Sequence, residues 1–128
     1  MPENITLLRG EIDKIDDLII SSLFDGFHPS LRNGGSITNE EVGQLLTTQL
    51  RFSDMTWQLL ENRMDIARKI GREKRRLGIE NSVDEARKKS MIESRVKMAL
   101  QRKEKIRALF TIIHDISVRI QNEIIAQP

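Results

Sequence analysis

The stretch IRALFTIIHDISVRIQNEI, residues 106–124, decides the fold of this chain. Its apolar residues recur in steps of three and four, which places them on one face of a helix with 3.6 residues per turn. The pattern predicts one long helix with a narrow apolar seam. The seam consists of Ile106, Leu109, Ile113, Ile116, Ile120 and Ile124.

A similar seam lies near the N-terminus and predicts a helix over residues 5–24. Pro29 and the pair Gly34-Gly35 follow it, and neither residue type continues a helix. The chain must therefore turn between about residues 25 and 37. The seam of this first helix consists of Ile5, Leu8, Ile12, Ile15, Ile19 and Leu23.

Capping signals delimit the helical residues between these two seams. Thr38-x-x-Glu41 is a capping box and predicts the start of a second helix. At Ser53 the chain either caps a further helix or continues the same one. In both cases the helical stretch ends near Leu77, because Gly78 is suited to the position that follows a helix C-terminus.

A further capping box, Ser82-x-x-Glu85, predicts a helix that extends to about Ala99. No strand-like alternation appears in the sequence. The 128 residues suffice for one modest core, and aromatic residues make up only 4%. Such a composition favours long helices packed through aliphatic seams. We therefore expect one all-α domain over residues 1–128, a small helical bundle.

The composition excludes several classes of protein and site. With 38% hydrophobic and 31% charged residues, the chain is neither a disordered tail nor a membrane span. It has no Cys, which rules out disulfides, thiolate metal sites and a cysteine nucleophile. His28 and His114 are too few for most metal-site patterns. The first residues show no basic region followed by an apolar one, so we expect a cytoplasmic protein.

The net charge of +2 conceals an asymmetry between the two halves. Residues 1–62 carry four basic and ten acidic side chains, a net charge of −6, which leaves +8 for residues 63–128. A positive half indicates an anionic partner, either a nucleic acid or a small carboxylate or phosphate.

Several polar residues are in register beside the apolar seams. Arg63 and Lys74 are eleven residues apart, close to three helical turns, so both point the same way. About 16 Å along the axis separates them, and two long cationic side chains can converge on one anion between them. A second polar stripe borders the seam of residues 106–124 and consists of Phe110, His114, Ser117 and Gln121.

Taken in order, these motifs resemble the all-helical (type II) chorismate mutases. Residues 8–16 and 62–74 resemble the two halves of the first helix of that family. Asp84-x-x-Arg87 resembles its second-helix motif, and residues 109–121, with Ser117 and Gln121, resemble its third helix. The resemblance covers about residues 5–23 and 58–125.

The resemblance implies the intramolecular rearrangement of chorismate, a small dicarboxylate, to prephenate in aromatic amino-acid biosynthesis. This reaction of the shikimate pathway needs no cofactor, metal or nucleophile. Lys74 and Gln121 would donate hydrogen bonds to the ether oxygen whose bond breaks, and Arg63 would serve catalysis and binding alike. The expected substrate-binding residues are Arg9, Arg63, Asp84, Arg87, Lys88 and Ser117.

The individual binding roles follow from the same resemblance. Arg9 and Arg63 would bind the two carboxylates of the substrate, and Arg87 and Ser117 would hold the same anionic ends. Asp84 would lie near the ring hydroxyl.

The sequence departs from the family pattern in three places. Lys88 stands where the family usually has a Glu that accepts from the ring hydroxyl. His114 stands at a usually apolar position close to the substrate. An inserted segment, about residues 24–57, splits the first-helix motif. Because the related isochorismate pyruvate-lyases also lack that Glu, a lyase-like enzyme is one alternative, and a non-catalytic regulatory relative of the same fold is another.

Nucleic-acid binding is the alternative from a different class. Basic residues cluster in residues 68–76, 87–89 and 102–107. Aromatic platforms for bases are missing, and the basic residues spread round the helices as solvated charges do. We therefore expect neither a nucleic-acid nor a membrane partner.

The split first helix leads to a prediction of topology. In the family, both arginine motifs lie on one helix, and each site takes its first arginine from the partner chain of an intertwined dimer. Here a continuous helix from Arg9 to Arg63 would span about 80 Å. We expect instead that residues 5–24 fold back antiparallel along residues 38–77, with Leu23 near Ser53, so that Arg9 reaches the site of its own chain.

The remaining alternatives concern the insertion and the oligomeric state. Residues 38–52 are either covered by the returning loop or form a separate short helix that breaks at Ser53. The first helix could instead cross to a partner chain while the insertion bulges out. The sequence is compatible with a homodimer and with a monomer that carries a complete site.

Overall fold

A computed structural model describes residues 3–23, 35–80 and 85–128. These residues form five helices and, within the described ranges, no strand. The helices are α1 (Glu3–Ser22), α2 (Asn39–Leu46), α3 (Asp54–Arg76), α4 (Glu85–Met98) and α5 (Lys103–Ile125). The expected all-α fold is confirmed.

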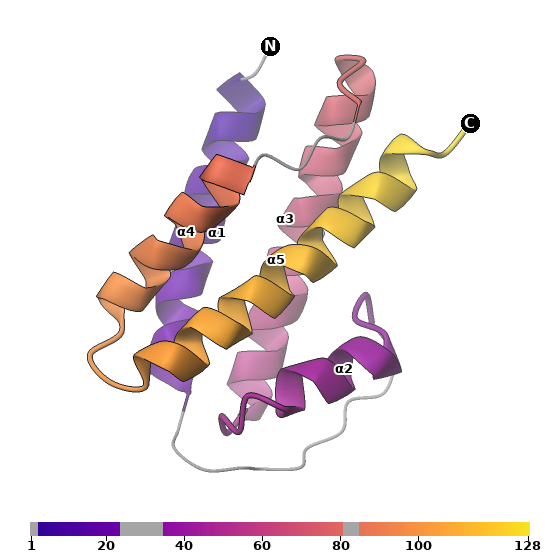
Figure 1. Cartoon of the computed structure of the whole chain (residues 1–128). Helices are drawn as coiled ribbons and strands as arrows, with labels where there is room; N and C mark the ends of the chain where they lie inside the picture. Colours follow the sequence, from indigo (N-terminus) through magenta and orange to yellow (C-terminus); the bar gives the residue numbers. More distant parts are fainter. Residues whose placement is uncertain (1–2, 24–34, 81–84) are drawn as a thin grey trace.

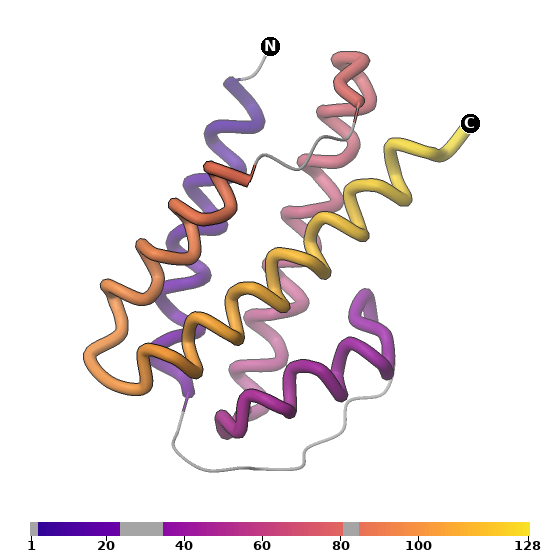
Figure 2. Tube along the Cα trace, in the orientation of Figure 1, coloured from indigo at the N-terminus to yellow at the C-terminus, as the bar shows by residue number. Residues whose placement is uncertain are grey.

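The four long helices form two layers (Figure 1). α1 and α3 lie side by side in one layer, and α4 and α5 cross in front of them. The short helix α2 lies across one end of the bundle against α5. The tube in Figure 2 shows that α1 and α3 run in opposite directions, as do α4 and α5. None of the described helices is both long and apolar enough to span a bilayer.

α2 and α3 are separate helices, each with its own capping box. The Thr38 hydroxyl accepts from the amide of Glu41 at 3.2 Å, and the Glu41 carboxylate accepts from the amide of Thr38 at 2.9 Å. Ser53 and Thr56 exchange the same pair of bonds at the start of α3, at 3.2 and 3.1 Å. The prediction that Ser53 caps a further helix is confirmed, and the alternative of one continuous helix is wrong.

The end of α3 follows its sequence signal. Gly78 has a φ of +71°, a left-handed conformation that costs glycine no steric strain. Its amide donates to the carbonyl of Arg75 at 3.1 Å, and the amide of Ile79 donates to that of Lys74 at 2.8 Å. This pair of bonds is a Schellman motif, which satisfies the last carbonyls of the helix. The capping box expected at Ser82 lies outside the described residues.

The first helix packs against α3 of its own chain, antiparallel to it. The Ser22 and Thr56 hydroxyls are 2.9 Å apart at one end, and Ile5 and Ile70 belong to the same buried cluster at the other. This register is close to the one expected, which placed Leu23 near Ser53. The hairpin alternative therefore describes how α1 lies in this chain.

The segment that separates α1 from α3 contributes to the core. Ile37, Val42, Leu45, Leu50 and Phe52 are all at most 4% exposed and belong to the main apolar cluster. Of the two expectations for residues 38–52, the separate short helix is correct, although it ends at Leu46 and not at Ser53. Because these side chains bury so fully against α3 and α5, the segment completes the bundle instead of bulging from it.

An ion pair fixes this segment to α5. Arg119 donates to both carboxylate oxygens of Glu41 at 2.7 Å and to the carbonyl of Ser36 at 2.8 Å. Burial raises the pKa of Glu41, but the hydrogen bonds and charge of Arg119 outweigh burial and hold this pKa below its usual value. A bidentate arginine–carboxylate pair of this kind fixes orientation as well as position.

Candidate active site

A polar pocket lies where the four long helices converge. Each helix contributes residues from one side, so the pocket depends on the docking of all four. Its lining consists of Arg9, Ile12 and Asp13 from α1, Arg63, Ile70 and Lys74 from α3, Arg87, Met91 and Arg95 from α4, and His114, Ser117, Val118 and Gln121 from α5.

The lining is strongly cationic. Among the described residues it holds five Arg and Lys side chains and one carboxylate, that of Asp13. A pocket with this surplus of positive charge favours an anion, and a dianion more than a monoanion. The same described ranges contain no group of three or more His, Cys, Asp or Glu that could hold a metal ion.

Most of the site residues expected from the sequence meet in this pocket. The residues that the structure brings together are Arg9, Arg63, Lys74, Arg87, His114, Ser117 and Gln121. Lys88 is not among the lining residues, and Asp84 lies outside the described residues.

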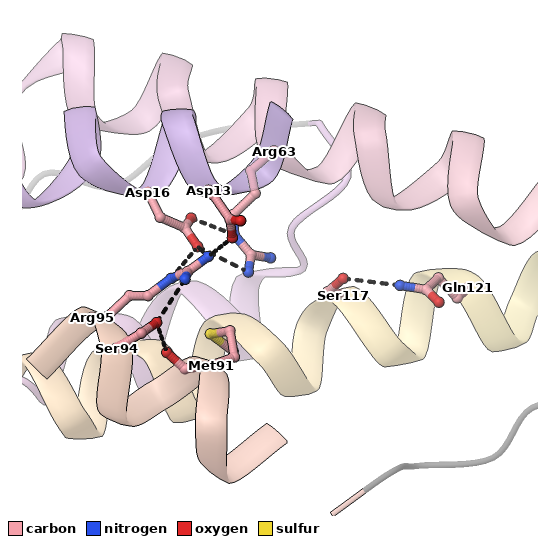
Figure 3. A network of polar contacts seen from close by, with 8 residues as sticks. All are labelled: Asp13, Asp16, Arg63, Met91, Ser94, Arg95, Ser117 and Gln121. Atoms are coloured by element: carbon pink, nitrogen blue, oxygen red, sulfur yellow. Dashed lines mark hydrogen bonds and ion pairs between the residues drawn. The ribbon is translucent and has the colours of Figure 1, made fainter. Parts of the chain in front are cut away.

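Lys74 and Gln121 face each other across α3 and α5. The Lys74 ammonium donates to Oε1 of Gln121 at 2.8 Å, and Nε2 of Gln121 donates to the Ser117 hydroxyl at 3.2 Å. The second of these bonds appears in Figure 3. Gly71 makes this approach feasible, because a Cβ on it would stand 3.2 Å from the Cα of Gln121. The two helices therefore approach closely about one turn before the lysine.

Lys74 lies in a positive environment. Burial lowers the pKa of Lys74, and the charges of Arg9 and Arg87 lower it further. These two arginines come from α1 and α4, so three helices direct positive charge into the same part of the pocket. An anion bound there relieves the repulsion and restores the affinity of the lysine for its proton.

Arg63 is held by a buried carboxylate. Its Nε donates to Asp16 at 2.6 Å and its Nη2 donates to the other oxygen at 3.4 Å. Arg63 is 2% exposed and Asp16 is fully buried. Arg95, from α4, also donates to Asp16, through Nε at 2.9 Å (Figure 3).

The remaining end of the Arg63 guanidinium is unoccupied by protein. Its Nη1 is buried and has no hydrogen-bond partner among the residues that the structure describes. In Figure 3 this end of the group points away from the two aspartates, on the side where Ser117 lies. A buried guanidinium nitrogen without an acceptor is costly, so its position in the pocket lining indicates an anionic ligand.

His114 is a neutral group in the pocket wall. Burial lowers the pKa of His114, and the charges of Lys88 and Arg63 add to this, outweighing the opposite effect of Asp115. Its Nδ1 has no hydrogen-bond partner within the described ranges, since the Asp115 carboxylate is 3.8 Å away. Neutral imidazole offers one donor and one acceptor, so a ligand meets a polar group here.

Lys88, expected from the sequence to bind substrate, lies outside the pocket lining. Its ammonium donates to the Asp115 carboxylate at 3.1 Å and lines a different depression between α4 and α5. The sequence places Lys88 directly after Arg87, but successive helical residues point about 100° apart. Arg87 therefore faces the pocket, while Lys88 faces Asp115 of α5.

Three charged residues of this region were missed by the sequence reasoning, namely Asp13, Asp16 and Arg95. A signal existed for two of them. Asp16 lies four residues after Ile12 and three before Ile19, on the apolar stripe of α1. Arg95 lies three residues after the buried Ile92, and a charge on a buried helix face needs a partner.

The comparisons with known proteins agree with this architecture. The sequence model of one family, described as chorismate mutase type II, matches residues 55–122, more than half of the chain. The match spans α3, α4 and most of α5, while Arg9 on α1 lies outside it. Neither the curated proteins nor the solved structures gave a match. On the family match, this chain belongs to the chorismate mutase type II family.

Proposed function

We propose that this protein is a chorismate mutase that converts chorismate to prephenate in aromatic amino-acid biosynthesis, with one domain over residues 1–128 that carries a complete site. The observation that carries the proposal is the Lys74–Gln121 pair. Its two side chains are 2.8 Å apart in a pocket lined by four arginines of the described chain. Membership of the chorismate mutase type II family supports the same reaction.

The substrate is a dianion, and the arginines are placed to bind it. Arg63 offers the buried Nη1, and Arg9 and Arg87 line the pocket from the two helices on either side. Charge-assisted hydrogen bonds from guanidinium to carboxylate are strong and geometrically specific. By holding both carboxylates at once, the arginines select the compact conformer in which the reacting carbons approach each other.

The rearrangement breaks a carbon–oxygen bond and forms a carbon–carbon bond within one molecule. Negative charge develops on the ether oxygen as its bond lengthens. Lys74 has three N–H donors and the Gln121 amide nitrogen has two. Each has a donor beyond the one in the hydrogen bond described above, so both can donate to the ether oxygen while Lys74 keeps its bond to Gln121 and Gln121 keeps its bond to Ser117. Fixed donors of this kind stabilise charge that exists mainly in the transition state.

A second candidate is a lyase of the same fold that acts on an isomer of chorismate. His114 favours it, because this polar group lines the pocket at a position that is usually apolar in the mutases. A hydrogen bond from the imidazole to a differently placed ring substituent would change which isomer fits. Lys88 carries no argument for the lyase, since it lies outside the pocket.

Turnover by the purified protein tests both candidates. Chorismate at micromolar enzyme should lose its ultraviolet absorbance, and prephenate should appear in equal amount. Isochorismate is the matched substrate, and release of pyruvate from it is followed with lactate dehydrogenase. Faster pyruvate release than chorismate loss favours the lyase. Absence of both reactions contradicts catalysis and leaves a regulatory relative of the family.

A further inference from the structure

Asp16 receives two arginines at once. Arg63 of α3 contacts it at 2.6 and 3.4 Å, and Arg95 of α4 contacts it at 2.9 and 2.7 Å. The carboxylate itself belongs to α1 and is fully buried. One carboxylate thus joins three helices beside the pocket (Figure 3).

The two arginines differ in how completely they are satisfied. In Arg95, Nε donates to Asp16, Nη2 to Asp13 and Asp16, and Nη1 to the Ser94 hydroxyl at 2.8 Å. In Arg63, Nε and Nη2 both donate to Asp16, while Nη1 has no acceptor within the described chain. Arg95 is therefore bound on every nitrogen, whereas Arg63 keeps one end for a ligand.

A long arginine side chain has many rotamers, and fixing one of them costs entropy. Contact with Asp16 through both Nε and Nη2 leaves the guanidinium plane of Arg63 one orientation. In that orientation Nη1 points away from the two aspartates, and Arg63 lines the pocket. Asp16 does not line the pocket and does not reach a ligand itself.

We propose that Asp16 is the positioning residue of the site, which sets the direction of the Arg63 guanidinium and so the place where the substrate carboxylate binds. The proposal rests on the proposed function for its kinetic readout. Arg95 also contacts Asp16 and contributes to the same arrangement. Its charge offsets the buried carboxylate, so Asp16 does not cancel the charge that Arg63 presents to the substrate.

The decisive variants are Asp16→Asn, Arg95→Gln and the two together. An asparagine has the shape of the aspartate but only one acceptor, so in the single variant its NH2 group must face one of the arginines. When Arg95→Gln is added, the new amide at position 95 accepts from that NH2 group. The asparagine oxygen is then available to Arg63 alone.

The kinetic expectation is a loss followed by rescue. Asp16→Asn should lower kcat/KM by about 10²-fold, because a misplaced binding group costs this much. The double variant should recover at least about a tenth of the wild-type kcat/KM. If Asp16 served only stability, the two substitutions would add and the double variant would be the worse enzyme. Asp17→Asn, on the exposed side of α1, is the matched control and should leave kcat/KM unchanged.

A readout without substrate separates this proposal from the proposed function. In ¹⁵N NMR spectra, an arginine Nε–H that donates to a buried carboxylate exchanges slowly with water. Wild-type protein should show such protection for Arg63, Asp16→Asn should lose it, and the double variant should regain it. Protection of Arg63 that survives in Asp16→Asn, or that stays lost in the double variant, overturns the proposal even if chorismate is not the substrate.

Stability could obscure the single variant, so folding is measured by circular dichroism for each protein. If Asp16→Asn does not fold, Arg95→Gln alone still decides. In that variant Asp16 accepts hydrogen bonds from Arg63 and no longer from Arg95, so slow exchange of the Arg63 Nε–H must persist. Loss of that protection in a folded Arg95→Gln protein would mean that Arg95, not Asp16, holds the guanidinium.

Discussion

Two regions of the bundle differ in the side chains that α3 and α5 contribute to them. At the end where α2 lies, apolar side chains such as Leu45 and Phe52 belong to the same buried cluster as side chains of α3 and α5. Farther along, Arg63 and Lys74 of α3 and Gln121 of α5 line the polar pocket instead. The difference teaches that stability and ligand binding are assigned to separate lengths of the same helices.

Of the substitutions proposed here, that of Lys74 should have the largest effect on catalysis. Its effect should be limited to the region that contains Arg63, Lys74 and Gln121, which we call the charged end. We expect Lys74→Ala to lower kcat by about 10²- to 10³-fold, with a smaller change in KM, because its donor acts mainly in the transition state. Steady-state kinetics with chorismate measures both parameters. The melting temperature should not fall, since removing a cation from a positive cluster relieves repulsion. Equal, small changes in kcat and KM would identify Lys74 as a solvated charge.

Mixing two inactive chains tests whether the charged end is complete within one chain. Arg9→Ala and Arg63→Ala should each lower kcat/KM by about 10²-fold, because each loses a charge-assisted bond to substrate. A mixture that has been unfolded and refolded together should stay as inactive as its parts. Recovery toward a quarter or half of wild-type activity would show sites shared between chains. The control for successful refolding is a mixture of wild type with a chain that carries both Arg9→Ala and Arg63→Ala.

Substitution at the apolar end should affect stability without affecting chemistry. Leu45 is fully buried, and we expect Leu45→Ala to lower the free energy of unfolding by about 2–5 kcal/mol. Urea denaturation measures this loss, and kcat of the folded fraction should match wild type. Leu100→Ala is the control, since Leu100 is 94% exposed. A loss of kcat at low urea in Leu45→Ala would show that the two ends are coupled.

The smallest effect is expected at Lys88, which borders the charged end from outside. Lys88→Met should raise the pKa of His114, because the charge of Lys88 lowers it. NMR titration of the imidazole measures this shift, and kcat/KM should change by less than about threefold because Lys88 lines a different depression. A tenfold change would mean that Lys88 reaches the substrate after all.

The same histidine makes a pH dependence of stability. The pKa of His114 is lower in the folded state than in the unfolded chain, so the unfolded chain binds the proton more readily. The stability that neutral His114 contributes is present above its unfolded pKa and is lost as the pH falls through the folded pKa. Urea denaturation of wild type and Lys88→Met over this pH range should show a smaller loss in the variant.

Local chemistry made the helix boundaries and most of the site predictable. The caps at Thr38 and Ser53 and the glycine at position 78 act through bonds to residues within five positions, so they can be identified in the sequence. The helical period likewise placed Arg63 and Lys74 on one face, and both line the pocket.

The parts that escaped prediction depend on partners far away in the chain. Asp16 is understood only beside Arg63 and Arg95, which follow it by 47 and 79 residues. Lys88 turns outward toward Asp115, on another helix. A helical pattern gives the face of a residue relative to its own helix but not the rotation of that helix in the bundle. The resemblance placed Lys88 in the substrate site from its sequence position alone, whereas the packing of α4 against α5 places it in a different depression.

The absence of a side chain at Gly71 determines which substitutions this protein can accept between α3 and α5. Any larger group there would meet the backbone of Gln121 and the side chain of Ile124 at 3.2–3.4 Å, so the helix axes would have to separate by a few tenths of an ångström. The ammonium and amide that meet at 2.8 Å would separate with them. A single added methyl group could thus cost turnover while leaving the bundle folded, and position 71 limits how far the interior can be enlarged by substitution.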